Sequence, residues 1–277
     1  MLNTFPTPLI LVDSSVAVPT ASREVARLTD KDRLLAAFNA PTAFTLFHEA
    51  VLGAHGIDPR QSSSTRPPSE LAYSAIAATS TSLSTLLAAV ATPLAERSCH
   101  RVSAGLVCQS TLDEAVSQSQ ACWMAGLVGT DCTVLGVAAG QAATLHAIEM
   151  GAALMQDSDE PSIALLVAAE RWLAPYPRTI DGFSVRGDAA AGVSITNDPE
   201  AQGWQLTGIV TESPSRAHDH VETVDREANP IIEYWGVDEI QRQAMVNRLT
   251  RAIRRLFDAT NLTPAEITVV IPPLWHH

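Results

Sequence analysis

The sequence predicts a layered α/β protein, in which helices cover the faces of a β-sheet. Between residues 101 and 195, short apolar runs rich in β-branched side chains alternate with longer stretches of helical periodicity. The chain has 277 residues, 46% of them hydrophobic, which is enough for one large core or two smaller ones. No stretch approaches the roughly 18 uninterrupted apolar residues of a membrane-spanning helix.

The first third of the chain is expected to open with a strand. Residues 8–18 form an apolar, β-branched run that is closed by Pro19. Apolar residues then recur at helical spacing up to residue 52, and residues 61–69, rich in Ser, Arg and Pro, predict an exposed loop. The Ala-, Leu- and Ser-rich residues 69–91 predict a helix.

The centre of the chain predicts the body of the sheet. We expect two helices, over 111–127 and 139–156. Strands are expected at 101–108, 132–137, 162–169 and 190–195, of which 132–137 reads as short and buried and 162–169 as fully apolar.

Composition shifts near Pro199, which predicts a boundary between a unit of residues 1–199 and a unit of residues 200–277. The second unit is expected to begin with a strand at 204–210 and to end with a buried strand at 267–271. Between them, residues 238–261 predict a charged helix N-capped by Asp238. Its predicted buried stripe consists of Ile240, Val246, Leu249, Ile253, Leu256 and Phe257.

Charge and residue usage exclude several classes of function. A net charge of −12 repels phosphate backbones and anionic lipid, so we expect no binding to nucleic acid or to membranes. The one basic patch, four arginines between Arg248 and Arg255, is interpreted as a solvated helix face. Lys31 is the only lysine, which makes Schiff-base chemistry improbable. The N-terminus lacks the features of a secretory signal, so a cytoplasmic location is expected.

Cysteine and histidine spacing predicts neither a metal site nor a cofactor site. The four cysteines, Cys99, Cys108, Cys122 and Cys132, are separated by nine, fourteen and ten positions, which match no metal clamp or redox pair. We interpret them as buried apolar thiols. His218 and His220 would need a third convergent ligand to hold a metal ion.

Four segments occur in an order that is typical of a known family. They are the opening strand with its Pro (10–19), a strand with a Ser/Thr-rich end (106–111), a strand running through a small-residue turn into a helix (133–148), and a strand followed by a Gly-Asp turn (165–191). Together they resemble the ketoacyl-ACP synthase III branch of the thiolase-fold superfamily, although Ala189 stands where that family prefers Gly. The resemblance implies a thiolase-like layered α-β-α fold with a complete first half and an abbreviated second half.

The resemblance also implies where the family's nucleophile would lie. In that family, a cysteine at the N-terminus of a buried helix attacks an acyl thioester, because the helix dipole lowers the pKa of its thiol. Matching Gly140 and Leu145 to that helix puts Ala138 at the nucleophile position, and a slip of one residue would put Ala139 there. Neither side chain can form a thioester.

The family's other catalytic groups are missing in the same way. Its histidine follows a strand ending in Ile-Pro, and here that position is occupied by Pro273. His276 or His277 would reach this place only after a local insertion. The family's asparagine segment would lie beyond residue 277.

The leading hypothesis is a synthase III-like subunit without its own nucleophile, which pairs with an active homologous ketosynthase or with itself. The resemblance implies pairing through the strand at 133–137, with an acyl carrier protein as a possible further partner and acyl-CoA or an acyl-carrier thioester as a possible ligand.

The second hypothesis is an acyltransferase, hydrolase or decarboxylase that works without covalent capture. It would use the backbone of Ala139 and Gly140 as an oxyanion site, assisted by Gln141, Ser110 or a terminal histidine. A third hypothesis is a scaffold that needs no pocket.

Overall fold

The computed structural model describes residues 2–20, 22–24, 75–78, 81–109, 119–129, 131–139, 142–156, 160–171, 179–180, 184–185, 187–212, 220–224, 230–234 and 239–269. Its centre is a six-stranded mixed sheet. The strand order is β10 (Trp204–Val210), β1 (Leu2–Ala17), β9 (Ala189–Thr196), β6 (Ser162–Glu170), β4 (Arg101–Cys108) and β5 (Thr133–Val137). Strands β6, β4 and β5 run parallel, whereas β9, β1 and β10 are joined to them by antiparallel pairing.

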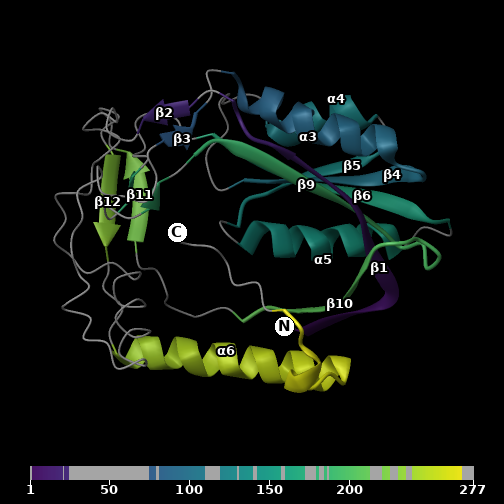
Figure 1. The fold of residues 1–277 in the computed structure, drawn as a ribbon, viewed down its shortest axis with the longest axis vertical. Helices are drawn as coiled ribbons and strands as arrows, with labels where there is room; N and C mark the ends of the chain where they lie inside the picture. The colour runs from purple at the N-terminus through teal and green to yellow at the C-terminus, as the bar shows by residue number, and fades with distance from the viewer. Residues whose placement is uncertain are drawn as a thin grey trace.

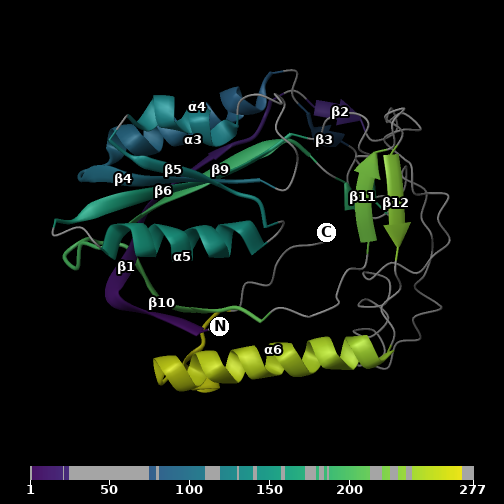
Figure 2. The same cartoon turned by 180° about the vertical axis from the view of Figure 1, so that it is seen from behind.

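Helices cover both faces of this sheet. Figures 1 and 2 show α3 (Leu83–Arg97) and α4 (Gln120–Val128) on one face and α5 (Ala143–Gln156) on the other. Each face has its own buried cluster, one around Leu87 and Leu165 beneath α3 and one around Leu106 and Met155 beneath α5. Helix α6 (Glu239–Thr260) lies beside β10 and β1. The predicted layered α/β architecture is therefore confirmed.

Three two-stranded sheets and one short helix complete the described elements. Strand β2 (Ser22–Glu24) pairs with β3 (Ala75–Ala77), and β7 (Thr179–Ile180) pairs with β8 (Ser184–Val185). Strand β11 (His220–Val224) pairs with β12 (Pro230–Tyr234), and the 3-10 helix η5 (Pro264–Glu266) follows α6. In the part of the chain that is described, no helix is both long and apolar enough to cross a membrane.

The strands of the central sheet follow the sequence closely. Strand β4 has the predicted bounds, and β6 and β9 differ from their predicted ends by one residue. Both β4 and β6 are long buried apolar runs, as expected for parallel strands covered on both faces. Strand β5 forms as predicted but is not buried, because it is the last strand of the sheet and only its final residue, Val137, is buried.

Helix α3 corrects the prediction of a helix over 69–91. The described part of that range contains β3, and the helix begins only at Leu83, where the hydroxyl of Ser82 accepts a hydrogen bond from the amide of Thr85. The helix then continues past Pro93 to Arg97. A proline removes one helical hydrogen bond, but Leu94 is fully buried in the same core and holds the last turn in place.

Two expectations about the second unit are wrong. In the predicted buried stripe of α6, Leu249 and Ile253 are 62% and 45% exposed, whereas Leu256 and Phe257 are half-buried. The burial of Ile240 and Val246 is not described. Residues 267–269 form no strand and are exposed, with Val269 70% exposed. Asp238, residues 34–52 and 61–69, and the rest of the predicted last strand lie outside the described residues.

The central sheet continues across the predicted boundary at residue 199. Strand β10, which follows that boundary, pairs with β1 and so joins the six-stranded sheet of the first unit. A Cβ atom added to Gly203, just before β10, would collide with the carbonyl oxygen of Leu11, so only glycine permits the two segments to approach this closely. The division into two units stays a prediction.

Candidate functional site

The candidate site lies at the carboxyl edge of the sheet, where β4, β5 and β6 end and α5 begins. Because these strands are parallel, their last residues meet at the same edge, and Cys108 is in register with Val137 of β5 and Ala168 of β6. The amide of Gln109 donates to the carbonyl oxygen of Val137 at 3.4 Å, which ties the ends of β4 and β5 together. Ligands of open α/β sheets bind at this kind of edge.

The two residues after β5 are the ones that the sequence assigns to the nucleophile position. Ala138 and Ala139 are both exposed, and the carbonyl oxygen of Ala139 accepts a hydrogen bond from the amide of Ala142 at 3.2 Å. Helix α5 begins at the next residue, Ala143. The turn can offer amide groups and the positive end of a helix dipole to an anion, but neither alanine can form a covalent bond with an acyl group.

A thiol that the sequence analysis did not place at the site lies beside this turn. Cys108, the last residue of β4, is 2% exposed and shares a hydrogen bond with the side chain of Thr144 in the first turn of α5. Burial raises the pKa of the Cys108 thiol to about 11; the bond to Thr144 opposes this rise, and the negative charge of Glu170 adds to it. At neutral pH Cys108 is therefore a protonated thiol and a poor nucleophile.

The other cysteines do not contribute to the site. Cys99 and Cys122 are exposed and Cys132 is half-buried, so the prediction of four buried thiols is correct only for Cys108. Burial also raises the pKa of Cys132. Nothing in the spacing of the cysteines distinguished Cys108, and the available signal was its position at the end of an apolar strand.

A histidine paired with a glutamate lies on the outer side of α5. Nδ1 of His146 and Oε2 of Glu149 are 3.2 Å apart, and these side chains are 37% and 18% exposed. If Nδ1 carries the proton and donates a hydrogen bond to the carboxylate, Nε2 is left as a proton acceptor. His146 lies three residues into the helix, about 5 Å along its axis from the first residue. The i, i+3 spacing in the sequence is the signal that could have found this pair.

Several of the predicted site residues cannot be placed. Ser110, Gly140, Gln141, Pro273, His276 and His277 all lie outside the described residues. Among the described residues, no group of three or more His, Cys, Asp or Glu side chains could hold a metal ion.

No protein-family model matches the sequence, and a comparison with curated proteins finds no match. The fold does match solved structures. Among them is the acyltransferase ChlB3, which is 16% identical with a TM-score of 0.62, the match covering 94% of this chain and 74% of ChlB3. Another is 3-oxoacyl-(acyl carrier protein) synthase III, FabH, from Pseudomonas aeruginosa PAO1, at 14% identity and a TM-score of 0.62, covering 97% of this chain and 76% of FabH.

A third similar structure is the HMG synthase of the curacin biosynthetic pathway, at 13% identity and a TM-score of 0.51. The match covers 94% of this chain but only 56% of that synthase. At these identities the likeness concerns the fold, which is a thiolase-like α/β fold built on a partial sheet.

Proposed function

We propose that the chain is a non-nucleophilic 3-oxoacyl-ACP synthase III-like subunit that pairs with an active ketosynthase in fatty-acid-type or polyketide-type biosynthesis in the cytoplasm. The observation that carries this proposal is the junction between β5 and α5, where Ala138 and Ala139 follow the strand and precede the helix. The neighbouring thiol of Cys108 does not replace the missing nucleophile, because burial raises its pKa to about 11. A helix start of this kind can polarise a thioester without capturing its acyl group.

Strand β5 is the proposed site of pairing with the homologous subunit. It is the outermost strand at its end of the sheet, and in the described chain no strand lies along its outer side. Thr133 and Gly136 are exposed on it, and Trp123 on the adjoining α4 is 46% exposed. An unpaired strand edge with apolar surface beside it is the kind of feature that another chain covers.

An acyl carrier protein is the proposed second partner. One of the similar structures, a curacin-pathway HMG synthase with 12% identity and a TM-score of 0.52, is a complex with an acetyl donor-ACP. The proposal for this chain rests on the shared fold. It also rests on the predicted chemistry, in which the acyl group arrives as a thioester and no resident cofactor is needed.

Acylation of the purified chain tests the proposal directly. With radiolabelled acyl-CoA, the wild-type chain is expected to take up no stoichiometric label, whereas Ala138→Cys is expected to take up label if the turn adjoins a pocket that admits the acyl group. Ala153→Cys is a matched control, because Ala153 is exposed on the same helix but lies more than two turns from its start. Stoichiometric labelling of one wild-type residue contradicts the proposal, and a folded Ala138→Cys variant without label favours a scaffold that needs no pocket.

The second candidate is an acyltransferase or thioester hydrolase that works without a covalent intermediate. The specific observation in its favour is the pair His146–Glu149, since a histidine oriented by a carboxylate can take a proton from water or an acceptor alcohol. Turnover of an acyl-CoA by the isolated chain that is lost in His146→Gln and kept in His100→Gln would support this candidate. No turnover across several acyl chain lengths would leave the first proposal in place.

A further inference from the structure

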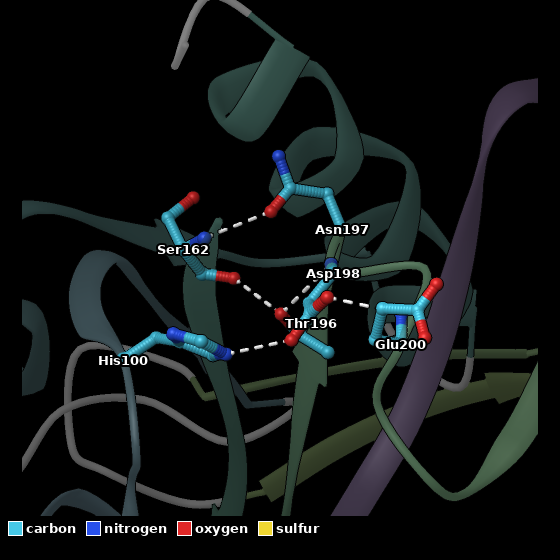
Figure 3. A network of polar contacts seen from close by, with 6 residues as sticks. All are labelled: His100, Ser162, Thr196, Asn197, Asp198 and Glu200. Carbon is cyan, nitrogen blue, oxygen red and sulfur yellow. Dashed lines mark hydrogen bonds and ion pairs between the residues drawn. The ribbon is translucent and has the colours of Figure 1, made fainter. Parts of the chain in front are cut away.

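A network of polar contacts lies at the opposite end of the sheet, and Figure 3 shows the contacts that link His100, Ser162 and the segment from Thr196 to Glu200. We call this end the amino edge, because β4 and β6 begin there, at Arg101 and Ser162. The hydroxyl of Thr196 donates to the carbonyl oxygen of Ser162 at 2.8 Å, and the amide of Asp198 donates to the same hydroxyl at 3.2 Å. The end of β9 is thereby fixed to the start of β6.

Asn197 connects this network to helix α5. Its Nδ2 donates to the carbonyl oxygen of Met155 at 3.3 Å, and its Oδ1 accepts from the amide of Ser162 at 2.8 Å. These two bonds fix the orientation of the Asn197 side-chain amide, because one partner is an acceptor and the other is a donor. Met155 is the penultimate residue of α5, where helical carbonyl groups lack partners within the helix. Asn197 therefore ties the C-terminal end of α5 to the first residue of β6.

Asp198 and His100 hold Asn197 in place. Oδ2 of Asp198 lies 2.9 Å from Nε2 of His100, and Oδ1 accepts from the amide of Glu200 at 3.0 Å. These side chains are 28% exposed for His100 and 18% for Asp198, so the contact is partly shielded from water. The Glu200 amide and the His100 ring lower the pKa of Asp198. The residue after Asn197 is thus anchored to the segment that leads into β4.

The way in which α5 packs on the sheet makes an anchor at its C-terminal end important for its position. The buried side of the helix contains Ala143, Ala147 and Gly151, and a Cβ atom added to Gly151 would lie 3.1 Å from Cδ1 of Leu106 and 3.2 Å from Cβ of Ala164. Small residues let the helix lie close to the sheet, and the one long side chain among its buried residues, Met155, lies near the C-terminal end. The axial position of α5 is therefore held mainly at that end, where Met155 is buried and Asn197 bonds its carbonyl oxygen.

We infer that Asn197, supported by Asp198 and His100, is a positioning residue that fixes helix α5 from its C-terminal end and thereby sets the contact between Thr144 and Cys108 at its N-terminal end. This inference does not depend on the proposed function. Helix α5 has 14 residues and spans about 21 Å, so the two ends communicate through one rigid element.

The native cysteines supply the test. Cys108 is buried, so iodoacetamide can reach it only after a local opening at the start of α5, whereas Cys122 on α4 is exposed and serves as the internal reference. The alkylation rate of each cysteine is measured by mass spectrometry on the full chain in native buffer. In Asn197→Ala, which loses two hydrogen bonds, we expect the Cys108 rate to rise roughly tenfold relative to the Cys122 rate.

The matched control is Asp13→Asn. It removes the negative charge of the Asp13 side chain, which lies 2.7 Å from Arg97. Arg97 belongs to α3, which covers the face of the sheet opposite to α5 (Figure 1). We expect the Cys108 rate to stay at the wild-type value in this variant. An unchanged Cys108 rate in Asn197→Ala, or an equal rise in both variants, overturns the inference, because the effect would then be absent or a consequence of global stability.

A milder variant decides the question if Asn197→Ala does not fold. Asp198→Asn keeps the shape of the side chain and removes only its charge, and we expect the Cys108 rate to rise roughly two- to threefold relative to Cys122, the lower end of the range for one weakened hydrogen bond. A Cys108 rate equal to that of the wild type in Asp198→Asn contradicts the positioning role.

Discussion

The amino edge and the carboxyl edge of the same three-layered body differ in what their side chains do. At the amino edge, Thr196, Asn197 and Asp198 form a connected set of hydrogen bonds that joins β9, β6, α5 and the segment before β4. At the carboxyl edge, the turn before α5 presents two exposed alanines, and the thiol of Cys108, at the end of the neighbouring strand, is buried and neutral. Among the described residues, the edge that commonly carries chemistry in α/β sheets is the plainer one here. The difference teaches that contacts which stabilise the fold can be concentrated at one edge of a sheet while small side chains form the turn at the other edge.

The largest effect is expected from a change that disturbs both edges together. Gly151→Leu should lift α5 from the sheet, because even a Cβ atom at this position would crowd Leu106 and Ala164. We expect the free energy of unfolding to fall by about 3 kcal/mol, measured by urea denaturation. Ala153→Leu, at an exposed position of the same helix, should change it by less than about 0.5 kcal/mol. Equal effects of the two substitutions would mean that α5 is not seated as described.

The next effect concerns the thiol at the carboxyl edge. Because the pKa of Cys108 in the folded protein is raised to about 11, above the ordinary value, its contribution to stability is complete below about pH 8.5 and is lost as the pH rises toward 11. The wild-type protein should lose about 2 kcal/mol more than Cys108→Ala between pH 8 and pH 11. Urea denaturation at several pH values measures this difference. If the free energies of unfolding of the two proteins changed with pH in parallel, the pKa of Cys108 would be ordinary and its assignment as an unreactive thiol would be wrong.

One chemical change made at both edges compares them directly. Thr196→Val leaves the carbonyl oxygen of Ser162 and the amide of Asp198 without their buried partner, and we expect a loss of about 1.5 kcal/mol in the free energy of unfolding. Thr144→Val removes only a bond from an exposed hydroxyl to a thiol, and should cost less than about 0.5 kcal/mol. The same substitution should also raise the pKa of Cys108 further, since the bond to Thr144 lowers it. Losses of similar size at the two positions would remove the contrast between the edges.

The smallest effect is an acid dependence at the amino edge. The pKa of Asp198 is lowered in the folded protein by the Glu200 amide and by His100, so its carboxylate contributes to stability above the ordinary aspartate pKa of about 3.9 and loses that contribution as the pH falls further. The wild type should therefore be more stable than Asp198→Asn at pH 7, and this advantage should shrink below about pH 4. Urea midpoints at pH 7, 5 and 3 measure it. A constant difference across this range would show that the charge of Asp198 is not what stabilises the network.

The strands were more predictable than the surfaces that they leave open. Strands β4 and β6 follow from long apolar runs, because a strand buried on both faces needs apolar residues at every position. Helical periodicity located α6 equally well, but it identifies the apolar side of a helix and not the partner that covers it, so Leu249 and Ile253 were wrongly expected to be buried. Residues 267–269 were also wrongly expected to be buried, because an apolar run does not show which partner covers it.

The candidate site was predictable only in part. The position of Ala138 and Ala139 between a strand and a helix followed from the resemblance to a family, and the structure confirms that β5 precedes them and α5 follows. The approach of Cys108 to Thr144 joins residues from two separate elements, and no local pattern in the sequence encodes such a contact. The same holds for Asn197 and Met155, which are far apart in the chain and meet only through the sheet.

The small-residue seat of α5 has a consequence for how this chain tolerates change. A library selected only for correct folding should accept many substitutions at Ala138 and Ala139, which are open to solvent, and very few at Ala147 and Gly151, which press against the sheet. Sequence change would thus be rapid at the exposed turn before α5 and slow on the buried side of the helix that follows it. The turn could therefore gain or lose a functional side chain without any rebuilding of the scaffold.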